Sequence, residues 1–255
     1  MKKFASIVLG IFAAFAVCSC NNEYVMEPAL SDTQTDMEVL SRFVDVNEAT
    51  NEYYINENKK TRALSYVTGS DWEALEKVSP LSVEKYKRDL QTLNAQVASA
   101  ISNPNVAYML FSVNGKTLVK KLRDSKFGFE KSSNNLNASR SIPTPLQIYG
   151  GQQTTTQQFY DSSRTINMNV NLSSIVQNNY YFFEVLSPDA KPNNDDNIST
   201  PESVAFSGSG PLWNSSFVWT TYWDVNVPGK GFKWEFRGKG TSPSSGFIAD
   251  CTFSK

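Results

Sequence analysis

The stretch Ile166-Asn167-Met168-Asn169-Val170-Asn171-Leu172 decides the fold of the C-terminal half of the chain. Every second residue is apolar and asparagines fill the gaps, which is the pattern of a strand with one buried and one wet face. Further strand patterns follow at 180–186, 216–227, 232–237 and 247–253. Many short strands over residues 146–255 predict an antiparallel β-sandwich or small barrel.

The strands at 216–227 and 232–237 are expected to form a hairpin around the turn 228–231, where Gly229 can adopt a type II′ conformation. This register pairs Trp223 with Phe236 and keeps apolar residues opposite one another at each rung. On the other face it places Asp224 opposite Glu235. A shift of one residue would disrupt both faces together, which favours this pairing.

Residues 61–130 predict a small α+β region. Ser79 as N-cap and Pro80 at the first helical position begin a helix that ends at Asn103. Its apolar residues recur at spacings of three and four, so they form one stripe, namely Val83, Tyr86, Leu90, Leu93, Val97 and Ile101. Asn114 and Gly115 then predict a tight hairpin between 106–113 and 116–122.

The remaining segments are a tether at 20–60 and a linker at 131–145. Because a helix-and-hairpin region is followed by an antiparallel β region, the predicted fold class is α+β. The tether contains a predicted short helix near 37–43, and a hairpin from 43–46 and 53–55 is expected to begin the folded part. The stretch 207–210 before Pro211 has the composition of a flexible connection.

The first nineteen residues are a signal peptide: Lys2 and Lys3 precede an apolar run over 4–17 that is too short to span a bilayer. The run ends in Val17-Cys18-Ser19-Cys20, which resembles the lipobox of type II signal peptides. The resemblance implies that Cys20 becomes the acylated first residue and that acyl chains such as palmitate hold the protein on a membrane. Because Asn21 is not aspartate, it implies the outer membrane, and the polar leader from Asn21 is similar to Bacteroidota-type surface lipoproteins.

The composition excludes several classes of chemistry. The chain has no histidine, so it cannot form a histidine-served nucleophile or an imidazole zinc site. Its formal charge of −1 does not predict nucleic-acid binding. Cys251 has no intramolecular disulfide partner after signal cleavage and lipidation, and its place in the last strand predicts a small buried residue. No cofactor is indicated.

Four tryptophans and a tyrosine lie close together in the sequence: Trp213, Trp219, Tyr222, Trp223 and Trp234. Aromatic rings that stack on sugars would explain this clustering, and Trp213 and Tyr222 are the better candidates because they lie off the apolar stripe. For the other three, Trp219, Trp223 and Trp234, which share the apolar face, burial in the core is the favoured explanation. The sequence therefore favours non-catalytic binding of a glycan or another extracellular ligand at the bacterial surface.

Three other readings stay open. A lipid-anchored structural or adhesion subunit would resemble the lipoprotein pilins. The Asp224 and Glu235 pair is close enough for a carboxylate-based glycoside hydrolase, although neighbouring cations favour a surface ion network. The oxygen-rich loop with Asp189, Asp195 and Asp196 offers weak calcium ligands, and a solvated turn is its default reading.

Overall fold

The computed structural model describes residues 36–58, 67–125, 127–131, 146–151, 155–161, 165–174, 179–186, 191–192, 202–210, 215–223, 232–240 and 246–254. Residues 155–161, 191–192, 215–223 and 232–235, and a few strand ends, are described by their backbone alone. The predicted signal peptide, Cys20 and most of the predicted linker therefore lie outside the described residues.

Helix α4 (Pro80–Ser102) forms as the sequence predicts. The Ser79 hydroxyl accepts a hydrogen bond from the Ser82 amide at 3.1 Å, and Asn103 is the C-cap. Four residues of the predicted stripe are fully buried, and Val83 and Ile101 are partly buried beside them. The shorter helix α3 (Gly69–Leu75) precedes it and begins with a capping box at Thr68.

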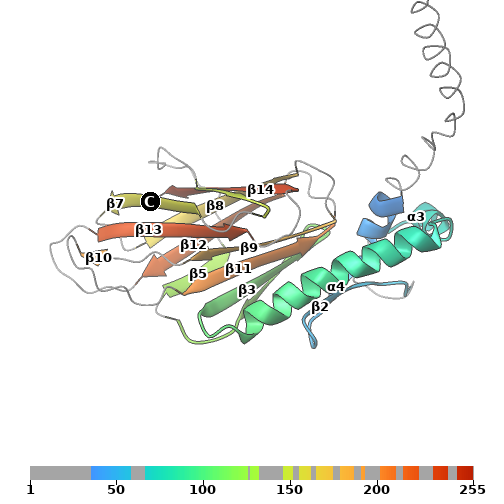
Figure 1. Ribbon diagram of the computed structural model, residues 1–255, viewed down its shortest axis with the longest axis horizontal. Coiled ribbons are helices and arrows are strands. Elements are labelled where there is room, and N and C mark those ends of the chain that lie inside the picture. Colours follow the sequence, from blue (N-terminus) through green and yellow to red (C-terminus); the bar gives the residue numbers. More distant parts are fainter. Residues whose placement is uncertain are drawn as a thin grey trace, which may run out of the picture.

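The central layer is a seven-stranded sheet that is covered by α4 on one side (Figure 1). Its strand order is β10-β13-β9-β11-β3-β4, and β7 also pairs with β13. The strands are β3 (Val106–Val113), β4 (Lys116–Lys121), β7 (Thr155–Asp161), β9 (Tyr180–Leu186), β10 (Lys191–Pro192), β11 (Ser203–Ser209) and β13 (Phe232–Gly240). The β3–β4 hairpin is confirmed, with positive φ at both Asn114 and Gly115.

The third layer is a five-stranded antiparallel sheet in the order β5-β12-β8-β14-β6. Its strands are β5 (Phe127–Lys131), β6 (Leu146–Tyr149), β8 (Thr165–Ser174), β12 (Ser215–Trp223) and β14 (Phe247–Ser254). The alternation in β8 is confirmed, because its four apolar residues are at most 3 % exposed and belong to the core between the two sheets. Cys251 is also fully buried there as a free thiol.

These layers give an α+β fold with β-sandwich-like sheets, and both sheet orders are open in the part of the chain that is described. A second core lies between α4 and the seven-stranded sheet, where β1 (Val44–Asn47) and β2 (Glu52–Ile55) form the predicted N-terminal hairpin. The short helix at 36–42 also contributes Met37 and Leu40 to this core. Residues 36–58 of the predicted tether are therefore folded.

The predicted hairpin between 216–227 and 232–237 is wrong. Strand β12 lies in the five-stranded sheet between β5 and β8, whereas β13 lies in the seven-stranded sheet beside β7 and β9. Trp223 pairs with Phe127, and Phe236 pairs with Gln157. Two strands of facing sheets satisfy an apolar alternation as well as two paired strands do, so the pattern alone could not separate these arrangements.

The prediction of a flexible stretch at 207–210 is also wrong, since Ser207–Ser209 belong to β11 at the centre of the seven-stranded sheet and are buried. Small residues are needed here because large rings pack on this strand. The Ser207 hydroxyl donates to the Leu110 carbonyl at 2.8 Å and accepts from the Tyr53 hydroxyl at 2.8 Å. In the same way, Ser209 links the Asn179 carbonyl and the Tyr86 hydroxyl.

Strands from both predicted regions are hydrogen-bonded into the same sheets. Strand β11 pairs in parallel with β3, a departure from the all-antiparallel expectation, and β12 pairs with β5. The sandwich core accordingly contains Leu110 and Phe129 together with Phe206 and Phe253. None of the helices that the structure describes has the length and apolar character required to cross a membrane.

Candidate functional site

The predicted aromatic residues do not lie on one hairpin. Trp219, Tyr222 and Trp223 belong to β12 of the five-stranded sheet, and Trp234 belongs to β13 of the seven-stranded sheet. The backbone register pairs Trp219 with Met168, a core residue, and Tyr222 with Thr165. Trp213 lies outside the described residues, as do the side chains of the other four, so the aromatic binding site stays a prediction.

The register that placed Asp224 opposite Glu235 is not the register of the structure. Glu235 pairs with Gln158 of β7, and the strand that leads to Asp224 ends at Trp223 in the other sheet. The weak calcium candidates Asp189, Asp195 and Asp196 lie outside the described residues. Within the described residues no three His, Cys, Asp or Glu side chains gather as a metal site would require.

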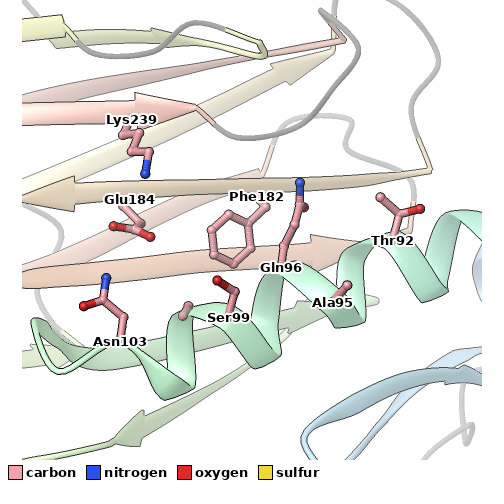
Figure 2. A pocket seen from close by; sticks show the side chains of 9 residues that line it. Thr92, Ala95, Gln96, Ser99, Asn103, Phe182, Glu184 and Lys239 are labelled. Atoms are coloured by element: carbon pink, nitrogen blue, oxygen red, sulfur yellow. The ribbon is translucent and has the colours of Figure 1, made fainter.

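A groove of about 350 Å³ lies where the side of α4 meets β9 and the end of β13 (Figure 2). We call it the helix–sheet groove. Its lining is Thr92, Ala95, Gln96, Ser99 and Ala100 of α4, the C-cap Asn103, Phe182 and Glu184 of β9, and Lys239 of β13. The volume lies within the range of about 300–1,000 Å³ that is typical of small-molecule sites.

The groove arises from the sequence of α4. Thr92, Gln96, Ser99 and Asn103 follow one another at spacings of three and four, so they lie along one side of the helix beside its buried stripe. The side chains of Ala95 and Ser99 are too short to fill the space above the sheet. Opposite them, the Phe182 ring, which is 2 % exposed, forms an apolar floor.

One end of the groove is charged. Glu184 and Lys239 are directly paired in the β9–β13 ladder, and residues opposite one another in antiparallel strands have Cβ atoms about 5 Å apart on the same face. Figure 2 shows the carboxylate and the ammonium both extending toward Asn103 at the end of α4. Among the described residues, neither side chain has an ion-pair or hydrogen-bond partner.

Asn103 is held in position by its neighbours. The Arg123 guanidinium donates to the Val106 carbonyl at 2.7 Å, to the Ile101 carbonyl at 2.9 Å and to the Asn103 carbonyl, and so fixes the end of α4. The Asn103 side-chain oxygen accepts from the Asn105 amide at 2.9 Å. This bond orients the Asn103 amide nitrogen toward the groove, on the side that faces Glu184 (Figure 2).

The other end of the groove is neutral. The Thr92 hydroxyl donates to the Arg88 carbonyl at 3.0 Å, which leaves its oxygen lone pairs able to accept a hydrogen bond from a ligand. The Gln96 amide and Ser99 hydroxyl lie between Thr92 and the charged end. The groove therefore offers polar groups of both kinds above an aromatic floor, an arrangement that can hold a small polar molecule.

Sequence reasoning missed this groove, although one signal was present. The strand 180–186 is correctly predicted to be central, since β9 lies between β13 and β11. Glu184 is the single charged residue in that otherwise apolar strand, and a charged residue is unusual in a buried strand unless it is paired. Its partner Lys239 could not be predicted, because the β9–β13 pairing joins distant segments.

A comparison with protein-family models finds no match for this chain, and a search of curated proteins finds no similar sequence.

Proposed function

We propose that this protein is a lipid-anchored protein of the bacterial outer membrane or cell surface that binds a small polar ligand, such as a glycan unit, without converting it. The observation that carries the proposal is the helix–sheet groove, with amide, hydroxyl and charged groups converging above Phe182. Ligand sites in proteins typically combine such an apolar surface with a few polar groups that converge on one hollow.

The lipid anchor rests on the sequence alone. An apolar run that ends in Val17-Cys18-Ser19-Cys20 supports acylation of Cys20, and an acyl chain contributes about 0.8 kcal/mol per buried methylene to membrane binding. Mass spectrometry of the N-terminal peptide should find fatty acids on Cys20, and Cys20→Ala should release the protein from the membrane. An unmodified N-terminus in the wild-type protein would refute the anchoring.

The side chains of the groove support binding rather than catalysis. Glycoside hydrolysis needs two carboxyl groups at the scissile bond, whereas Glu184 is the single carboxylate among the described residues that line the groove. The chain also has no histidine to transfer protons near neutral pH. The groove residues can therefore orient a ligand by hydrogen bonds and charge.

A panel of small ligands tests this function. The full chain in mild detergent is titrated by calorimetry with neutral mono- and disaccharides and with free amino acids. Ala95→Trp, which places a large ring in the groove, should abolish binding of any ligand held there. Ala98→Trp is the matched control, because Ala98 is exposed on the same helix and does not line the groove.

The expected result is that at least one ligand binds the wild-type and Ala98→Trp proteins and does not bind Ala95→Trp. If no member of the panel binds, or if binding is unaffected by Ala95→Trp, the helix–sheet groove is not the site and the proposed function fails.

A further inference from the structure

We infer that the ligand of the helix–sheet groove is a zwitterion of the amino-acid type, with its ammonium on Glu184 and its carboxylate on Lys239. This inference rests on the proposed function and names the class of ligand for the same site. It follows from the charged end of the groove, which a neutral sugar would leave unused.

Neither charge at this end of the groove is neutralised within the described part of the chain. Glu184 and Lys239 lie opposite each other on adjacent strands, yet they do not form an ion pair with each other or with any other described residue. Glu184 is half-buried, so part of its hydration is already lost. A ligand with both charges can insert between the two side chains and complete two charge-assisted hydrogen bonds at once.

The two charged side chains are also neighbours on the sheet. Directly opposed residues have Cβ atoms about 5 Å apart, and both side chains extend in the same direction in Figure 2. The ammonium and carboxylate of an amino acid are attached to a single carbon, so they are close enough to be bound together by this pair. Charges at opposite ends of a long molecule would not fit the pair equally well.

The surroundings of the charged end also fit an amino acid. The Asn103 amide nitrogen faces Glu184 on the side away from Lys239 and has no hydrogen-bond acceptor in the described part of the chain, so it can donate to a further polar atom of the ligand. Beyond this end, Phe182 and Ala100 form an apolar surface, and Ser99, Gln96 and Thr92 provide polar groups. A short side chain with a polar end fits this order.

Glutamine and its derivatives provide the test, because each charge can be removed separately from ligand and protein. N-acetylglutamine lacks the ammonium, and glutamine amide lacks the carboxylate. The wild-type protein should bind glutamine at least about tenfold more tightly than either derivative. In Glu184→Gln the preference over N-acetylglutamine should disappear while the preference over glutamine amide remains, and in Lys239→Met the reverse should hold.

The measurements are calorimetric titrations of the full chain in mild detergent, with Ala95→Trp and Ala98→Trp as before. N-acetylglucosamine is the neutral comparator. If it binds in the groove and glutamine does not, or if both preferences survive in both charge variants, the zwitterion inference is overturned and the proposed function stands. If neither ligand nor any other member of the panel binds in the groove, both fail.

Discussion

Replacing Gly208 with alanine should destabilise the fold through a clash with Tyr181. A Cβ atom at this position would lie 2.3 Å from Cε1 and Cζ of the Tyr181 ring and 2.5 Å from its hydroxyl oxygen. Ordinary contacts between carbon atoms are about 3.5–4.0 Å, so the ring would have to move by more than about 1 Å.

The ring has little room to move. Tyr181 is 2 % exposed, and the rings of Phe183 and Phe247 lie next to it, with centroids 5.9 Å and 6.2 Å away. Overpacking of this kind costs about 1–3 kcal/mol, which is the expected decrease in the free energy of unfolding.

Urea unfolding followed by far-ultraviolet circular dichroism measures this decrease. Gly69→Ala is the matched control, since nothing lies within 4 Å of the added atom, and it should change stability by less than about 0.5 kcal/mol. In a Tyr181→Leu background, which lacks the clashing ring atoms, Gly208→Ala should lose most of its effect. The reasoning is refuted if Gly208→Ala behaves like the control, or if its effect is unchanged in that background.

Three further predictions concern single side chains. Asn94 accepts from the Tyr53 amide at 2.8 Å and donates to the Tyr53 carbonyl at 2.9 Å, so Asn94→Leu should lower the free energy of unfolding in urea by about 2–4 kcal/mol; a loss below about 1 kcal/mol would contradict this. Ser79→Ala removes the acceptor for the Ser82 amide and should cost about 1 kcal/mol in the same assay, whereas Ser79→Asp should retain most of the cap; equal losses would argue against capping. Desolvation raises the pKa of Asp250 in the folded state, so the protonated carboxyl stabilises the fold relative to the charged one. This contribution is complete below the unfolded pKa of about 3.9 and is lost as the pH rises through the raised folded pKa. Asp250→Asn should therefore flatten the decline in stability that accompanies this rise in pH, and identical urea midpoints across the range in both proteins would exclude the effect.

Local signals predicted the elements that local interactions determine. Ser79 and Pro80 begin α4, and the positive φ angles of Asn114 and Gly115 shape the hairpin after it. Both depend on a few neighbouring residues. The alternation in β8 likewise identified a face that packs in the core.

The pairing of strands that lie far apart in the chain could not be predicted from the sequence. The small residues Ser207, Gly208 and Ser209 at the end of β11 predict a flexible stretch, although their size is what allows tyrosine rings to pack against them. The helix–sheet groove has the same origin, since it depends on the pairing of Glu184 with Lys239. Glu184 alone was visible in the sequence as a charge in an apolar strand.

The parallel pairing of β11 with β3 has a consequence for how the protein is made. The inner edge of β3 stays unpaired until Ser203–Ser209 have been synthesised, so the N-terminal strands cannot complete their sheet before the later strands are available. Chains dominated by such long-range contacts fold slowly and expose unpaired strand edges until they fold. A fragment that stops at Lys131 should accordingly aggregate rather than fold.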